Sequence, residues 1–171
     1  RSFTIFSKIG LPQIPKKSPK RLTVKDAFKG LGPATGKRDP LHAAAKLSEI
    51  AMQRVRLIPP NGGKPELMKR APKLCPTSWF ALGAQAVDVW GRMHFEKPSN
   101  TIRCCFWNPS KGRYLHPIEN RVITLREGAR LQGIPDSWSF DGHKSMIAQQ
   151  IGNGVPVPLA KAVARAISKL F

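Results

Sequence analysis

The chain has 171 residues, 41% of them hydrophobic, which is enough to build the core of one ordinary domain or of two small ones. Lysine and arginine number 29 against 10 acidic residues, and the formal charge of +19 indicates a polyanionic partner, most commonly a nucleic acid. No apolar stretch approaches the roughly 20 residues that a membrane-spanning helix needs, and no signal peptide opens the chain, so we expect no association with a membrane.

The cysteines and histidines indicate whether disulfides or a metal site are to be expected. The chain has three cysteines, Cys75, Cys104 and Cys105, so they cannot all pair in disulfides. The adjacent Cys104 and Cys105 would rarely form a disulfide with each other, because its geometry is strained. This pattern is typical of a reduced, cytoplasmic protein. The four histidines are scattered and no Cys-x-x-Cys pair occurs, so the sequence predicts no metal site.

At the start of the chain, Ser2 to Phe6 alternate polar and apolar side chains, which predicts a short strand that ends before Gly10. Residues 12–21 carry three prolines among four basic residues and are expected to form an extended connector. This connector is either a solvated linker or an arm that follows phosphates.

The middle of the chain opens with a predicted helix. Asp39 is placed to cap it, Pro40 suits its first turn, and apolar residues at spacings of three and four continue it toward Pro59. These residues are Leu41, Ala44, Leu47, Ala51 and Val55. From Lys64 to Trp107 the periodicity is poor, and candidate strands at Ala86–Trp90 and Thr101–Phe106 predict irregular, loop-rich β structure.

The last third carries clearer signals. Thr124 and Glu127 form a capping box, and Gly133 fits the left-handed position that ends a helix, so the sequence predicts a short helix over Leu125–Gln132. Pro158 opens a second predicted helix with one apolar face, which must pack on a surface within this chain or beyond it. That face consists of Leu159, Val163, Ala166, Ile167 and Leu170.

Two motifs carry the functional inference. Gln150–Pro158 reads QIGNGVPVP and places glycines beside a helix start, where free N–H groups can meet a ligand, although alone it is more often a plain turn. Upstream, Arg121–Asp136 reads RVITLREGARLQGIPD. Together they resemble the last two sequence blocks of the cytosine-5 DNA methyltransferase family, R-x-L-T-x-R-E-x-A-R-L-Q-G-F-P-D and Q-x-G-N-x-V-P-x-x-L.

The rest of the chain agrees with this resemblance in family order. Arg1 and the predicted strand after it resemble the end of the family's Q-x-R-x-R block, as if the chain began inside that block. Thr23–Leu31 resembles the connector that follows, and Arg92–Ile102 resembles a stretch of the target recognition region. The resemblance covers most of the chain, and only loosely residues 64–87.

The fold that the resemblance implies is α+β. An irregular, β-rich target recognition (small) domain would be joined by a strand and a C-terminal helix that complete an α/β Rossmann-like catalytic domain. Residues 1–35 would be the end of the catalytic sheet and the connector, 36–135 the recognition domain, and 136–171 the cofactor-side loop and the helix that returns to the catalytic domain.

The function implied is the transfer of a methyl group from S-adenosylmethionine to C5 of a flipped cytosine in a specific sequence of double-stranded DNA, in a restriction-modification system. The family's nucleophilic Pro-Cys-Gln block and its Glu-Asn-Val block do not occur here. The chain alone is therefore expected to be inactive and to need a second polypeptide or a missing N-terminal part. The alternatives are a tRNA cytosine-5 methyltransferase of the same family and a non-enzymatic, basic nucleic-acid-binding module.

The resemblance also implies roles for particular residues. Asn153, Gly154 and Val155 would complete the cofactor pocket, and Arg1 would face the flipped cytosine. Structural ion pairs are expected of Arg126 and Glu127, and Arg121 would either join them or contact DNA. Since Arg, Lys and Asn are the usual readers of base edges, the candidates for DNA contacts are Arg92, Lys97, Asn100, Thr101, Arg103, Lys111 and Arg113.

Overall fold

The computed structural model describes residues 4–19, 21–81 and 87–170, in which helices are joined by long irregular segments. These residues form no sheet, only three isolated β-bridges, Thr35–Ala43, Arg92–Leu115 and Leu115–Val122. The expected α+β fold, with its β-rich recognition domain and Rossmann-like strand, is therefore wrong. Leu115 is paired on both sides, but Gly112 and Pro117 leave too few consecutive residues around it for a ladder.

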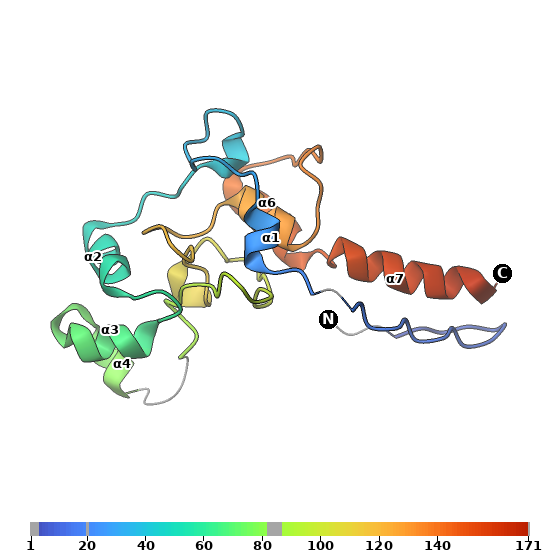
Figure 1. The fold of residues 1–171 in the computed structure, drawn as a ribbon, viewed down its shortest axis with the longest axis horizontal. Coiled ribbons are helices and arrows are strands. Elements are labelled where there is room, and N and C mark those ends of the chain that lie inside the picture. The colour runs from blue at the N-terminus through green and yellow to red at the C-terminus, as the bar shows by residue number, and fades with distance from the viewer. Residues whose placement is uncertain (1–3, 20, 82–86, 171) are drawn as a thin grey trace.

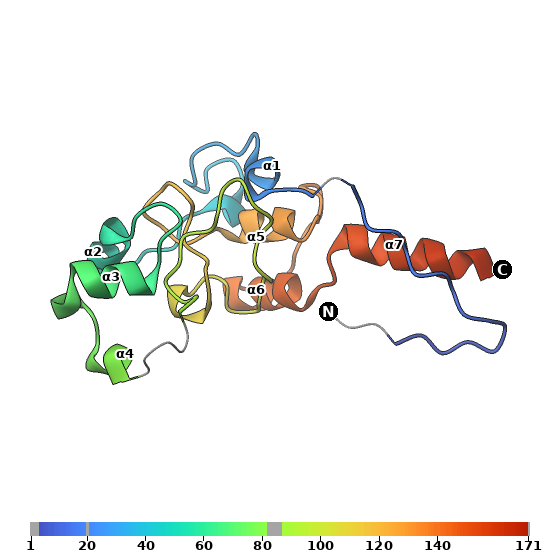
Figure 2. The same cartoon turned by 60° about the horizontal axis from the view of Figure 1, so that its bottom comes forward.

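The helices lie in one body with a projecting arm (Figures 1 and 2). The α-helices of the described residues are α1 (Val24–Phe28), α2 (Glu49–Leu57), α3 (Lys64–Arg70), α4 (Thr77–Ala81), α5 (Leu125–Leu131), α6 (Lys144–Asn153) and α7 (Val157–Ile167). The 3-10 turns are η1 (Pro40–His42), η2 (Pro72–Leu74), η3 (Pro109–Lys111) and η4 (Ser168–Leu170). Helix α5 is the centre of the body because it packs against α1, α6 and η1.

Residues 4–19 and α7 form the arm and lie side by side in both views (Figures 1 and 2). Thr4 to Phe6 have no strand partner, so the described part of the predicted Ser2–Phe6 strand is not a strand; Ser2 and Phe3 lie outside the described residues. Both parts of the arm are thinly packed: no α7 residue is buried, and Phe6 and Ile14 are more than 90% exposed.

The helix predicted to follow Asp39 is also wrong. Asp39 does cap, since its Oδ1 accepts from the Leu41 N–H at 2.9 Å, but the turn it caps is only η1. The bridge from Ala43 to Thr35 then holds the chain extended, and α2 begins at Glu49 with Ser48 as its cap. Only the last part of the predicted apolar spacing lies on a helix, α2, where Ala51 and Val55 are buried.

The signals in the last third are confirmed. Thr124 Oγ1 accepts from the Glu127 N–H and Glu127 Oε2 accepts from the Thr124 N–H, which is the predicted capping box at the start of α5. Gly133 has a φ of +72° just past that helix. The second predicted helix is α7.

Two features of the backbone differ from the predictions. Residues 101–103 are irregular and residues 104–106 form a turn instead of a strand, as do residues 87–90. Ala86 of the other candidate strand lies outside the described residues. Helix α6 was not predicted, because it includes Gly152 and has no side-chain cap at His143. None of the described helices is long and apolar enough to cross a membrane.

Candidate nucleic-acid and cofactor site

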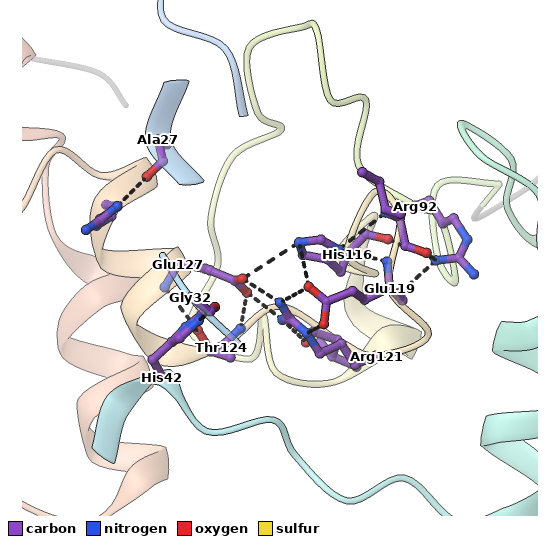
Figure 3. Close-up of polar contacts among 12 residues, drawn as sticks. Ala27, Gly32, His42, Arg92, His116, Glu119, Arg121, Thr124 and Glu127 are labelled. Atoms are coloured by element: carbon purple, nitrogen blue, oxygen red, sulfur yellow. Dashed lines mark hydrogen bonds and ion pairs between the residues drawn. The ribbon is translucent and has the colours of Figure 1, made fainter. Parts of the chain in front are cut away.

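A buried cluster of ion pairs lies at the start of α5 (Figure 3). Arg121 donates to both carboxylate oxygens of Glu127, at 2.8 and 2.7 Å, and both side chains are more than 90% buried. It also donates to both oxygens of the half-exposed Glu119. Burial opposes the charged form of Arg121, but the hydrogen bonds to Glu127 and Glu119 together raise its pKa above the ordinary value.

His116 is the third kind of side chain in this cluster, and it is neutral at neutral pH. Its Nδ1 accepts from the backbone N–H of Glu119 at 2.9 Å, and its ring stacks on Phe28 at 5.5 Å. Burial and then the charge of Arg121 lower the pKa of His116 to about 4, against the opposing pull of Glu127 and Glu119. The cluster therefore holds the segment that leads into α5 rigidly at neutral pH.

Arg92, one of the candidates for DNA contact, is buried (Figure 3). Every nitrogen of its guanidinium donates to protein: Nε to Ile58 O, Nη2 to Val55 O and Asn120 Oδ1, and Nη1 to the carbonyls of residues 116, 118 and 119. Desolvation by burial lowers its pKa. In this position Arg92 ties α2 to the segment before α5 and presents no free donor to a ligand.

Five of the seven candidate DNA-contact residues lie around one surface hollow, which we call the recognition hollow. They are Asn100, Thr101, Arg103, Lys111 and Arg113. Tyr114 helps to form the hollow, since its hydroxyl donates to Thr101 O at 2.8 Å. Residues 100, 101, 103 and 111 are exposed. Arg113 differs, because its Nη1 donates hydrogen bonds to the carbonyls of Asn61, Gly62 and Arg92.

One further candidate, Lys97, does not line the hollow. Lys97 is exposed, and its carbonyl accepts from the Val24 N–H at the start of α1. Arg1 lies outside the described residues. The structure thus brings together residues from two separate segments, 100–103 and 111–113, and leaves Lys97 on another part of the surface.

The candidate cofactor residues lie where α6 ends. Asn153 is the last residue of α6, and Gly154 and Val155 lead into α7, so the predicted loop is shorter than the motif. Gln132 holds this turn in place, because its Nε2 donates to Ile151 O at 2.9 Å and its carbonyl accepts from the Val157 N–H. Asn153 and Val155 are exposed, which leaves an amide and an apolar group on the surface.

Residues 103 and 104 pack directly on the end of α6. A Cβ at Gly152 would lie 2.4 Å from the backbone nitrogen of Cys104, so only glycine allows this approach. The Cys104 thiol donates to Asn153 Oδ1 at 2.9 Å. The sequence analysis did not predict this contact, although the glycine at position 152 of the QIGNGVPVP motif was the available signal.

Two further ion pairs join α5 to neighbouring segments. Arg126 Nε donates to Asp39 Oδ2, and Arg130 donates to both oxygens of Asp136. The hydrogen bonds from Arg130 lower the pKa of the Asp136 carboxyl. The buried Nη1 of Arg126 has no hydrogen-bond partner among the described residues.

Comparison with known proteins gives this arrangement a family. The family model of the C-5 cytosine-specific DNA methylases matches residues 45–169, and the chain belongs to that family of transferases. The resemblance of the two motifs to this family is thereby confirmed.

Its relatives include bacterial and mammalian enzymes. The type II methyltransferase M.Eco47II of Escherichia coli is 33% identical over 157 residues, which are 92% of this chain and 37% of that protein. The type II methyltransferase M.PspPI of Psychrobacter sp. is 35% identical over 158 residues, 91% of this chain and 38% of that protein. DNA (cytosine-5)-methyltransferase 1 of Mus musculus is 53% identical over 53 residues, 31% of this chain and 3% of that protein. The chain thus spans less than two fifths of the two bacterial relatives.

Proposed function

We propose that this chain is the target-recognition and cofactor-pocket-completing part of a DNA (cytosine-5-)-methyltransferase of a restriction-modification system. The observation that carries the proposal is the recognition hollow, where five residues selected for DNA contact lie together and four have exposed side chains. The formal charge of +19 supports a polyanionic substrate. Arg92, which is buried, is left out of the proposed contacts and assigned a structural role.

The residues around Asn153 fit one edge of an S-adenosylmethionine site. The cofactor carries polar and apolar parts, and this turn offers the exposed Asn153 amide beside the exposed Val155 side chain. Cys104 occupies Asn153 Oδ1, so the Nδ2 amide group is the donor available to a ligand. When bound, the cofactor supplies the methyl group, while these residues would orient it.

The nucleophile must come from elsewhere in the enzyme. The chain contains no Pro-Cys-Gln segment, and the family's chemistry needs that cysteine to attack C6 of a flipped cytosine. We propose that a second polypeptide, or a preceding part of a longer protein, carries it. Mixing this chain with a polypeptide that carries the family's catalytic half should produce cytosine methylation that neither gives alone, and no methylation from two folded partners would contradict the two-chain proposal.

Duplex binding tests the recognition hollow directly. Arg103→Gln combined with Lys111→Gln should weaken duplex binding and lower the slope of log K against log salt by up to about 2, since each phosphate contact contributes about 0.9. Lys161→Gln with Arg165→Gln removes the same charge from the exposed side of α7 and is the matched control. Equal effects of the two double variants would show that only overall charge matters.

The two alternatives are tested separately. Competition between duplex DNA and tRNA for the chain distinguishes a DNA methyltransferase from a tRNA methyltransferase, and we expect the duplex to compete better. For the non-enzymatic module, Asn153→Ala is decisive. It should lower the affinity of the assembled enzyme for S-adenosylmethionine, and an unchanged affinity would favour a binding module without a cofactor site.

A further inference from the structure

A second hollow lies beside α5 and shares no lining residue with the recognition hollow. We call it the Arg126 hollow. It is about 620 Å³ in volume and lies between the glycine-rich segment 30–36, the charged residues that follow and α5. Its charged lining residues are Lys37, Arg38, Asp39, Arg126, Arg130 and Asp136.

The charges of this hollow do not balance. Four cationic side chains face two carboxylates, which leaves a net charge of +2. Asp39 and Asp136 are already engaged by Arg126 and Arg130, so they are occupied as acceptors. Lys37 and Arg38 are exposed at the rim and form no ion pair with any described residue. The surplus cationic charge is therefore theirs.

Arg126 supplies an independent sign of a missing ligand. Its side chain is 93% buried, yet Nη1 donates no hydrogen bond to any described residue, and the Asp136 Oδ1 atom lies 3.8 Å away. Leaving a buried charged donor without a hydrogen-bond partner is destabilising, because the group has lost its water and gained nothing in exchange. A built-in deficit of this kind, beside surplus positive charge, is expected where an anion completes the hydrogen bonding.

We propose that the Arg126 hollow binds a phosphate group. A phosphate offers several strong acceptor oxygens to the planar donors of Arg126 and Arg38, and its charge matches the surplus of Lys37 and Arg38. Gly30 and Gly32 border open space, since a Cβ at either would touch nothing within 4 Å, so the hollow stays accessible along the backbone. The phosphate comes either from the DNA backbone or from a soluble phosphate.

Titration with inorganic phosphate tests the site without any DNA. At constant ionic strength, the backbone amide of Gly36 and the Nε–H of Arg126 should shift saturably in nitrogen–proton NMR spectra of the chain. Lys37→Gln with Arg38→Gln should raise the phosphate Kd about tenfold or more, a loss of about 1.4 kcal/mol. Lys69→Gln with Arg70→Gln, the adjacent Lys-Arg pair on α3, is the matched control and should leave the Kd unchanged.

Arg126→Gln tests the buried donor, with circular dichroism to show that the variant is folded. It too should weaken phosphate binding. If phosphate causes no saturable shift in the wild-type chain, or if the α3 control weakens binding as much as the rim variant, the proposal is overturned, whatever the result for DNA binding at the recognition hollow.

Duplex DNA distinguishes the two sources of the phosphate. If the backbone of DNA supplies it, Lys37→Gln with Arg38→Gln lowers the salt slope of duplex binding by up to about 2, equally for unrelated sequences. If the ligand is a soluble phosphate, the slope stays that of the wild-type chain while the phosphate Kd rises. Both results support a phosphate site, because both include the loss of inorganic phosphate binding.

Discussion

The pair of Arg121 and Glu127 is the most completely buried ionic contact of the described residues. Glu127→Gln keeps the size of the side chain but leaves Arg121 buried beside only the half-exposed Glu119. We expect the free energy of unfolding to fall by about 3 kcal/mol, because an incompletely paired buried charge keeps its desolvation cost. Urea denaturation followed by circular dichroism measures this loss.

Glu119→Gln is the matched control for that prediction. Glu119 contacts the same guanidinium, but its side chain is 51% exposed, and partly exposed pairs contribute only about 1 kcal/mol or less. If the two variants lose the same stability, burial is not what makes the Glu127 contact strong.

His116 makes stability depend on pH in a defined window. Its pKa of about 4 lies below the value near 6.5 expected in the unfolded chain, so the unfolded state takes up the proton first. Its contribution is fully present above about pH 6.5 and is lost as the pH falls toward 4, at up to about 1.4 kcal/mol per pH unit. Urea midpoints at pH 7 and pH 5 measure this change.

His116→Gln should remove most of this pH dependence, since glutamine does not titrate. The pKa of His94 is also lowered, through burial and then the charge of Arg113, but His94 is only half-buried. His94→Gln should therefore leave most of the acid sensitivity in place. An acid sensitivity that survives His116→Gln and disappears in His94→Gln would contradict this assignment.

At the scale of the elements, the contact of α6 with residues 103 and 104 depends on the absence of a side chain at Gly152. A Cβ there would collide with backbone atoms of residues 103 and 104, which cannot move as a flexible side chain does. Gly152→Ala should lower the free energy of unfolding by about 2 kcal/mol or more, despite the better helix propensity of alanine. Thermal denaturation measures the loss.

Gly32→Ala is the control for Gly152→Ala. Gly32 has open space around a Cβ and lacks a left-handed φ, so alanine should be neutral or slightly stabilising there, by about 0.4–1 kcal/mol, through the unfolded chain. Losses of similar size at both positions would mean that the close approach of Gly152 does not decide the effect.

The sequence predicted elements only where a local signal was complete. At α5 the capping box and Gly133 agree, and the helix forms where it was expected. At Asp39 the cap was present, but the bridge between Thr35 and Ala43, a contact distant in sequence, determines the backbone that follows. The strands failed for the same reason, because strand pairing depends on partners that periodicity does not reveal.

For the whole molecule, the resemblance identified the family and the residues that gather at the recognition hollow, but exposure followed from packing. Arg92 and Arg103 are both arginines in the expected DNA-contact region, yet one is buried against carbonyls and the other is exposed. Nothing in the pattern of residues around them separates the two. Likewise the Arg126 hollow forms from segments 30–39 and 126–136, which are far apart in the sequence.

The arm of α7 and residues 4–19 is the part of the molecule that its own body does not cover. Val163 and Ile167 lie one turn apart on the apolar face of α7, and neither is buried. If this face packs on the catalytic half of the proposed enzyme, then Val163→Asp with Ile167→Asp should abolish that assembly. The free energy of unfolding of the isolated chain should change little, because an arm with no buried residue contributes little to it.

Sedimentation of the mixed halves measures the assembly, and urea denaturation of the chain alone measures its stability. Lys161→Asp with Arg165→Asp places the same two aspartates on the exposed polar face of α7 and should leave the assembly intact. If that control also abolishes assembly, the charge of the arm matters and not its apolar face. If neither variant affects the assembly, α7 is not the contact. The exposed apolar side chains of residues 4–19 would then be the next ones to substitute.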